Sequence, residues 1–116
     1  MIFRKDRDLY NPQNIFAKIL RGEIPCTPVL ETDHVLAFAD IHPKAPVHIL
    51  VIPKGTYVDA HDFYVRAGDS EIIAFQRAVA DIVRIHNLHE TGFRLIANAG
   101  VNGGQEVPHY HVHILG

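Results

Sequence analysis

The sequence has few of the features that mark secreted or membrane-bound proteins. Cys26 is the only cysteine, so no disulfide can form within the chain, and a reducing compartment is expected. Residues 1–8 contain no apolar core of the signal-peptide type. The longest apolar run, around residues 45–53, is interrupted by His48 and is too short to span a bilayer. We therefore expect a cytoplasmic protein that has no membrane partner.

An excess of charge of either sign is also lacking. The chain has 11 Lys and Arg against 13 Asp and Glu, which gives a formal net charge of −2. Surfaces that bind nucleic acids carry clustered Lys and Arg, so a nucleic-acid partner is not expected. A small anionic ligand held by a few local groups remains compatible with this charge. The 116 residues, 47% of them apolar, fit one globular domain that covers residues 1–116.

Hydrophobic periodicity predicts an α+β fold with a five-stranded antiparallel sheet and two helices. We expect a short helix from the Asn14 cap to Arg21, and a main helix over residues 71–87 capped by Asp69 or Ser70. The connection over residues 54–68 mixes polar and aromatic residues, and its pattern favours no particular conformation. The five predicted strands are residues 29–31, 35–39, 47–52, 93–97 and 107–115.

The last predicted strand carries three of the nine histidines of the chain in strict alternation. Successive side chains of a strand point to opposite faces, so His109, His111 and His113 share one face. Tyr110 and Val112 share the other face and fit a core. Packing does not call for three imidazoles in a row on a surface, so the pattern indicates a functional face.

Three interpretations of this face compete: an exposed polar surface, a metal site and phosphate chemistry. Residues two apart on one face are separated by about 6.6 Å, so His109 and His113 lie roughly 13 Å apart. Zn–N bonds are only about 2 Å long, so the three histidines cannot share one ion. Two neighbours with a third ligand such as His48 could still hold one. In phosphate chemistry, one histidine attacks while its neighbours orient it and stabilise charge.

The loop before the histidines favours phosphate chemistry. Residues 98–105 include three glycines, which let backbone N–H groups come close to an anion. Asn98, Asn102 and Gln105 add side-chain donors. Such a loop is a weak signal alone, but here it leads directly into the histidines.

These residues resemble a known family. The segment His109–Leu115 resembles the His-x-His-x-His-x-x signature (x, apolar) of the histidine-triad, or HIT, superfamily. Residues 14–25 look like the N-terminal helix and turn of the family, and residues 37–54 resemble its central hairpin. Residues 103–109 continue into the triad in the manner of the Hint branch, the protein kinase C inhibitor-like proteins. Leu115–Gly116 also resembles that branch, rather than the Fhit branch of dinucleoside polyphosphate hydrolases.

The resemblance implies a HIT-like fold whose sheet extends across a homodimer, which would also cover the edge of the predicted strand 93–97. It implies a hydrolase that cleaves purine nucleoside 5′-phosphoramidates or related nucleotidyl conjugates through a covalent nucleotidyl-histidine intermediate. The ligand would be a purine nucleotide of the AMP type, and neither a metal nor another cofactor would be needed. Three alternatives remain: a non-catalytic nucleotide sensor, a dinucleoside polyphosphate hydrolase, and a metal-dependent hydrolase that uses a His-x-His pair.

The resemblance also implies a role for individual residues. The middle histidine of the triad is the nucleophile in the family, and this position is His111. His113 matches the contact to the phosphate and the leaving group, while His109 and His48 match a pair that orients the nucleophile. Asp40 matches the carboxylate that takes the ribose hydroxyls. Matches to phosphate contacts are Asn98 and the backbone of Gly104, Gln105 and Glu106, and matches to the apolar base slot are Ile15, Phe16, Ile19, Phe38 and Ile41.

Overall fold

The computed structural model describes residues 9–116. Residues 1–8, on which the expectation about a signal peptide rests, lie outside this range. In chain order the elements are α1 (Ile15–Leu20), β1 (Pro28–Glu31), β2 (Val35–Ala39), β3 (His48–Pro53), α2 (Ala60–Arg66), α3 (Asp69–Ile85), α4 (Leu88–Thr91), β4 (Arg94–Ile96) and β5 (Val112–Leu115). None of the helices in the described part is both long and apolar enough to cross a membrane.

The five strands form one sheet in the order β1-β2-β3-β5-β4, and every neighbouring pair is antiparallel. This confirms the predicted α+β class and the five-stranded antiparallel sheet. All six residues of β3 are buried, because β3 is the middle strand and is covered on both faces. The pairing of β3 with β5 sets His48 opposite Leu115 and Leu50 opposite His113.

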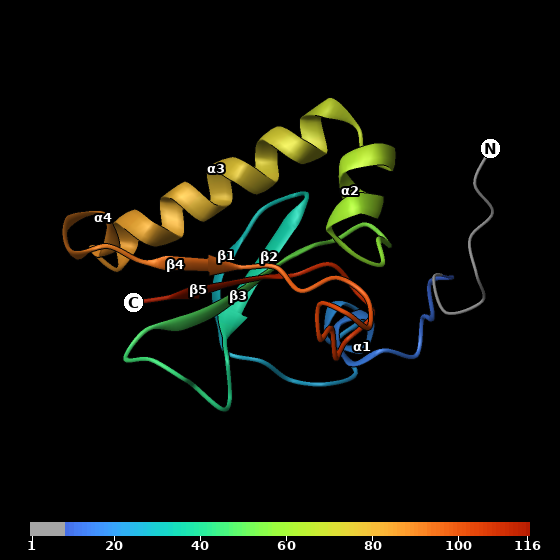
Figure 1. Ribbon diagram of the computed structural model, residues 1–116, viewed down its shortest axis with the longest axis horizontal. Coiled ribbons are helices and arrows are strands. Elements are labelled where there is room, and N and C mark those ends of the chain that lie inside the picture. The colour runs from blue at the N-terminus through green and yellow to red at the C-terminus, as the bar shows by residue number, and fades with distance from the viewer. Residues whose placement is uncertain (1–8) are drawn as a thin grey trace.

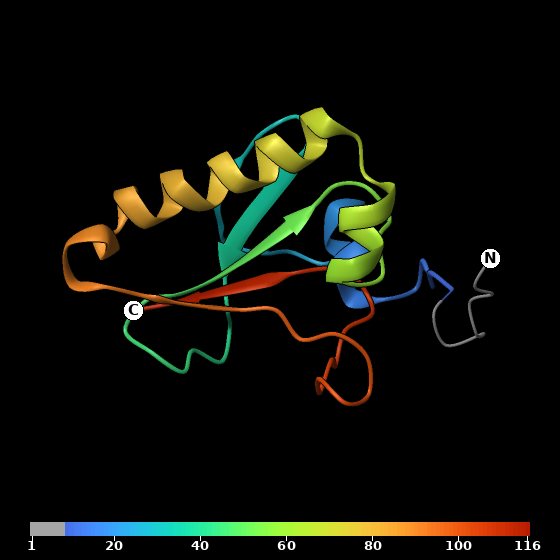
Figure 2. The same ribbon diagram turned by 45° about the horizontal axis from the view of Figure 1, so that its top comes forward.

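Each face of the sheet has its own apolar cluster. On one face α3 packs through Phe75 and Ile82, which are at most 1% exposed, against strand residues such as Val51 and Ile114. α3 runs along this side of the sheet (Figure 1). On the other face Phe16 of α1 packs against a smaller cluster that includes Leu50. Both views place the connection between β4 and β5 on the side away from α3 (Figures 1 and 2).

The predicted N-terminal helix is present, and its cap is the predicted one. The Asn14 side chain accepts a hydrogen bond from the Ala17 N–H at 2.9 Å, as an N-cap does. Gly22 follows the helix with a φ of +78°, a left-handed conformation that favours glycine. The main helix α3 begins at Asp69 with Gly68 as its cap, so it starts two residues before the predicted range. Glu71 instead supports the cap by accepting from the Gly68 N–H at 3.2 Å.

The structure has two helices, α2 and α4, in addition to the two that the sequence predicts. α2 falls in the connection for which no conformation was predicted, and α4 follows α3 directly. Asp59 caps α2 by accepting from the Asp62 N–H at 2.9 Å, and Phe63 is the one core residue it buries, at 1% exposure. A seven-residue helix that buries one large apolar side chain has no apolar stripe, so periodicity does not reveal it.

The last strand is shorter than predicted, since β5 begins only at Val112. Pro108 has no N–H to donate, and the His109 N–H bonds back to the Val107 carbonyl at 2.9 Å across a tight turn. The Tyr110 N–H bonds to the Tyr57 carbonyl at 2.7 Å instead of to a strand. His109 and His111 therefore lie in the segment that leads into β5 and not in the sheet.

Candidate active site

A pocket of about 720 Å³ opens on the side of the sheet that α1 covers. Its walls are α1, the end of β2, the start of β3, and the loop and histidines that precede and enter β5. This volume is typical of pockets for small-molecule ligands. All the predicted site residues line it except three, which are Asn102, Gln105 and His109.

His111 lies in the pocket wall with a defined proton position. Its Nδ1 is 2.7 Å from the carbonyl oxygen of His109, and because a carbonyl only accepts, Nδ1 carries the hydrogen. Burial lowers the pKa of His111 below 6.5, although this hydrogen bond and the charges of Asp40 and Glu106 act to raise it. The ring is therefore neutral at pH 7, and Nε2 has a free lone pair. Phe16 packs edge-on against the ring, with 4.9 Å between ring centroids.

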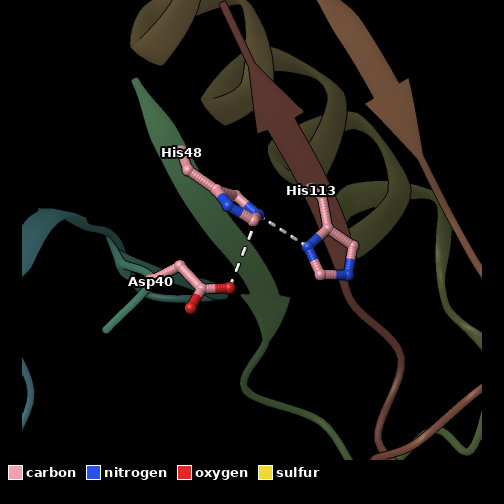
Figure 3. A group of neighbouring side chains, drawn as sticks. All are labelled: Asp40, His48 and His113. Carbon is pink, nitrogen blue, oxygen red and sulfur yellow. Dashed lines mark hydrogen bonds and ion pairs between the residues drawn. The ribbon is translucent and has the colours of Figure 1, made fainter. Parts of the chain in front are cut away.

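A second group of side chains in the pocket consists of Asp40, His48 of β3 and His113 of β5 (Figure 3). The Lys44 N–H donates to Nδ1 of His48 at 3.0 Å, so the hydrogen of neutral His48 is on Nε2. That Nε2 lies 2.9 Å from Nδ1 of His113 and 3.4 Å from Oδ2 of Asp40. Nδ1 of His113 therefore accepts, and neutral His113 carries its own hydrogen on Nε2. Burial lowers the pKa of His113, and His111 and His48 lower it further.

The predicted orienting pair acts differently from the expectation. The ring of His48 contacts His113 and not the nucleophile position His111. His109 does contact His111, but through its main-chain carbonyl. Its own ring is 0% exposed and lies outside the pocket, between Tyr10 and the Pro53 carbonyl. The two imidazoles thus do not orient His111 directly, because the chain turns at Pro108 and places the His109 ring behind the pocket wall.

A metal ion could be held by Asp40, His48 and His113, whose ligand atoms lie within 4.8 Å of one another. It is the only such group in the described part of the chain, and it contains one triad histidine, not three. Both ring nitrogens of His48 and Nδ1 of His113 already have hydrogen-bond partners. These three ring nitrogens therefore already take part in a hydrogen-bond network.

Asp40 and the apolar residues form the other side of the pocket. The Asp40 carboxylate is 18% exposed, and its Oδ1 accepts from the His42 N–H at 2.8 Å. Phe16 and Phe38 are 6% and 4% exposed and pack edge-on at 5.6 Å, so they are both core residues and pocket walls. Ile41 is 82% exposed beside them. Ile41 and Ile15, which is 44% exposed, are apolar side chains of the pocket that a flat ligand could still cover.

The glycine-rich loop is tied to the protein by Gln105. The side chain of Gln105 accepts from the Gly100 N–H at 2.9 Å and donates to the Val58 and Val107 carbonyls at 2.6 and 3.0 Å. The backbone N–H of Gln105 also donates within the loop, to the Gly100 carbonyl at 3.1 Å. Gln105 thus holds the loop together, and the prediction that its side chain is a free donor for the ligand is wrong.

The remaining polar groups of the loop differ in availability. The Gly104 N–H donates to the Val101 carbonyl at 3.1 Å, in a turn where Gly104 has a φ of +69°. Asn98 and Glu106 line the pocket, and within residues 9–116 their side chains have no hydrogen-bond partner. They are the two polar side chains of the loop that line the pocket.

Sequence reasoning missed Lys44 and Tyr10. Lys44 lines the pocket, and its N–H fixes the hydrogen on His48. The resemblance could have pointed to Lys44, since it lies within the central hairpin. His42, which the sequence places beside Asp40 as a residue that alters ligand contacts, also lines the pocket. Tyr10 contacts His109 across 99 positions of sequence, and no local pattern signals such a contact.

The fold and pocket define a small α+β protein with a pocket that is lined by two of three alternating histidines, His111 and His113. A profile of the HIT domain family matches residues 21–116. A 13.2 kDa HIT-like protein of Azospirillum brasilense is 56% identical over 106 residues, which cover 91% of this chain and 87% of that protein. The chain belongs to the HIT domain family.

Two further comparisons concern proteins with a stated activity. The purine nucleoside phosphoramidase of Escherichia coli strain K12 is 43% identical over 105 residues, covering 90% of this chain and 87% of the relative. The crystal structure of a HIT family hydrolase from Legionella pneumophila Philadelphia 1 superposes with a TM-score of 0.81 at 43% identity, covering 90% and 92% of the two chains.

Proposed function

We propose that the protein is a nucleotide-binding hydrolase that cleaves purine nucleoside 5′-phosphoramidates or related nucleotidyl conjugates, with Nε2 of His111 as the nucleophile. The observation that carries the proposal is the 2.7 Å hydrogen bond from Nδ1 of His111 to the His109 carbonyl. It leaves a neutral, lone-pair nitrogen in the wall of a pocket of nucleotide size. The phosphoramidase and hydrolase named among the relatives support the reaction class.

The reaction proceeds in two displacements. Nε2 of His111 attacks the α-phosphorus, the Nε2–P bond forms, and the bond from phosphorus to the leaving amine breaks. The amine departs with a proton taken from solvent, while Nε2–H of His113 contacts it or a phosphate oxygen. The nucleotidyl-imidazolium keeps its Nδ1–H on the His109 carbonyl, which stabilises the new positive charge. Water then attacks the phosphorus and gives one proton back to solvent, the Nε2–P bond breaks, and the nucleoside monophosphate and neutral His111 are released.

The rest of the pocket binds the nucleotide in this proposal. Asp40 accepts hydrogen bonds from the ribose hydroxyls, since an ionised carboxylate is an acceptor only. Ile41 and the Phe16–Phe38 pair hold the purine between apolar surfaces. Asn98 and Glu106 lie beside the phosphate and the leaving group. An amine leaving group is a cation once protonated, and the carboxylate of Glu106 attracts it.

Replacing His111 tests the proposal. In His111→Ala, single-turnover cleavage of an adenosine phosphoramidate should fall at least roughly a hundredfold, because the covalent route is lost. Binding of AMP, measured by calorimetry, should weaken by only about 1 kcal/mol, since Asp40 and the apolar walls remain. His113→Ala should lie between, because the attacking nitrogen remains but a donor is lost. His61→Ala, at an exposed position outside the pocket, is the matched control and should behave as wild type.

The same measurements distinguish the alternatives. Wild-type turnover in His111→Ala would disprove the nucleophile. A wild-type protein that binds AMP without cleaving any phosphoramidate would instead be a nucleotide sensor. Cleavage confined to dinucleoside polyphosphates would make it a hydrolase of that class. Mass detection of an adenylylated peptide that contains His111 checks the intermediate itself.

A further inference from the structure

A hydroxyl from the beginning of the described chain reaches the first histidine of the triad. Tyr10 lies just before the Asn14 cap of α1, and its Oη is 2.7 Å from Nδ1 of His109. The two rings pack edge-on with centroids 5.6 Å apart. The proposed reaction does not use this contact, and Tyr10 does not line the pocket.

The donor and acceptor at each atom follow from the partners. Nε2 of His109 lies 2.9 Å from the Pro53 carbonyl, which only accepts, so Nε2 carries the hydrogen. Burial lowers the pKa of His109 to about 4, so the ring is neutral at pH 7 and its Nδ1 is an acceptor. Burial also raises the pKa of Tyr10 above 10.0, so its hydroxyl keeps the proton. Tyr10 therefore donates to His109, and both ring nitrogens of His109 are held.

The residue held in this way supplies the carbonyl that binds His111. The His109 carbonyl accepts from Nδ1 of His111 at 2.7 Å. Because residues 109–111 lie outside β5, no strand ladder fixes the direction of this carbonyl. Its peptide is fixed by the His109 ring and by two backbone bonds, from His109 to Val107 at 2.9 Å and from Tyr110 to Tyr57 at 2.7 Å. Loss of a contact to the His109 ring should therefore change the direction of the His109 carbonyl.

We propose that Tyr10 is a positioning residue, which clamps the His109 ring so that the His109 carbonyl stays aimed at Nδ1 of His111 and Nε2 of His111 stays unprotonated. The functional part of this inference rests on the proposed role of His111 as nucleophile. Tyr10 touches no substrate in this arrangement and acts only through His109. It ties the segment before α1 to the catalytic histidine.

The chain offers a matched pair of variants for the test. Tyr10→Phe removes the hydroxyl that donates to His109 and keeps the ring. Tyr57→Phe removes another partly buried hydroxyl, which donates to Glu71 at 2.7 Å, and keeps the Tyr57 carbonyl that binds Tyr110. Both variants lose one hydroxyl hydrogen bond, so a general loss of stability should be similar in the two.

The first readout needs no substrate. Nitrogen-15 NMR of the imidazoles distinguishes a protonated from an unprotonated ring nitrogen. In wild type, His111 should be protonated at Nδ1 and His109 at Nε2. In Tyr10→Phe, the His109 nitrogen signals should shift and His111 should become a mixture of the two tautomers, while Tyr57→Phe should keep the wild-type pattern.

The second readout is steady-state cleavage of an adenosine phosphoramidate. Tyr10→Phe should lower kcat about tenfold, which corresponds to one hydrogen bond, and should change KM by less than about twofold. Tyr57→Phe should leave both constants unchanged. A wild-type His111 tautomer in Tyr10→Phe, or an equal loss of kcat in the two variants, would overturn the inference. Absence of turnover in the wild type would count against the proposed function, whereas the tautomers would still be decided by NMR.

Discussion

At the scale of the residue, the site is defined by which nitrogen of each buried imidazole carries the hydrogen. His111 donates from Nδ1 to a carbonyl, whereas His109 donates from Nε2 to a carbonyl. His48 accepts at Nδ1 from a backbone N–H, so its hydrogen is on Nε2. The backbone thus sets the tautomer at all three positions, and the proposed attacking lone pair belongs to the one of the three histidines whose Nδ1 carries the hydrogen.

The burial of neutral His109 makes the stability of the fold depend on pH in the acid range. The pKa of His109 is about 4 when folded against 6.5 when unfolded, so the unfolded chain binds protons more readily over this interval. The stabilising contribution is complete above pH 6.5 and is lost as the pH falls to 4. About 2.5 pKa units correspond to a loss on the order of 3 kcal/mol. Urea denaturation at a series of pH values measures this loss.

Two variants test whether His109 causes the loss of stability in acid. His109→Gln removes the titrating ring, so its free energy of unfolding should fall less steeply than that of wild type between pH 6.5 and 4. His61→Gln changes an exposed histidine and should keep the wild-type slope. If His109→Gln showed the wild-type slope as well, the sensitivity would belong to other groups.

Metal chelation tests the chemistry of the Asp40, His48 and His113 group. Turnover should be unchanged after treatment with a strong chelator, because the proposed nucleophile is a ring nitrogen of His111, which is not among the three candidate ligands. Added Zn²⁺ in excess should inhibit in competition with nucleotide, since the same three side chains would become its ligands. Loss of activity on chelation, restored by zinc, would favour the metal-dependent alternative.

At the scale of the element, sequence predicts what has a periodic apolar face. β2, β3 and the main helix were predicted to within two residues at each end because alternation and the 3.6-residue stripe are strong local signals. α2 was missed because it buries little more than Phe63. The start of β5 at Val112 was not predicted, because it depends on the hydrogen bond from Tyr110 to Tyr57, a contact between distant segments.

The candidate site likewise has a part that the sequence predicts and a part that only the folded chain determines. The alternation of the triad and the resemblance predicted several residues that line the pocket: His48, His111, His113, Asp40, Phe16 and Phe38. The partner of each ring could not be predicted, because Tyr10, Pro53 and Lys44 reach the histidines only through the folded chain. Gln105 was taken for a ligand donor since an amide in a glycine-rich loop gives no sign of which groups it will bind.

A single substitution at Gln105 should loosen the glycine-rich loop. Gln105→Glu keeps an acceptor for the Gly100 N–H but removes the amide that donates to the Val58 and Val107 carbonyls. A carboxylate would face those two carbonyls, so we expect the free energy of unfolding to fall by roughly 1–3 kcal/mol. KM should rise, because the loop that lines the pocket loses its tie to the protein. Gln76→Glu, at an exposed position of α3, is the matched control and should change neither quantity.

At the scale of the whole molecule, β4 is an edge strand of the described sheet. It is only three residues long and pairs on one side with β5, with Leu95 opposite Ile114. Leu95 is 52% exposed and the preceding Phe93 is 41% exposed. An edge with apolar side chains and unpaired backbone groups is a template for another strand. These features favour the homodimer, with a sheet that continues through β4, as the form of the protein in solution.

Sedimentation at micromolar concentration should therefore give about twice the 13.0 kDa mass of one chain. Leu95→Lys should shift the protein toward the monomer, because a buried charge in the centre of a small interface would lack a partner. Ile73→Lys places the same charge at an apolar position of α3 that is 58% exposed, away from β4, and should leave the dimer intact. Circular dichroism must show that both variants remain folded. A wild-type protein that sediments as a monomer, or a Leu95→Lys variant that stays dimeric, would show that copies do not join through this edge.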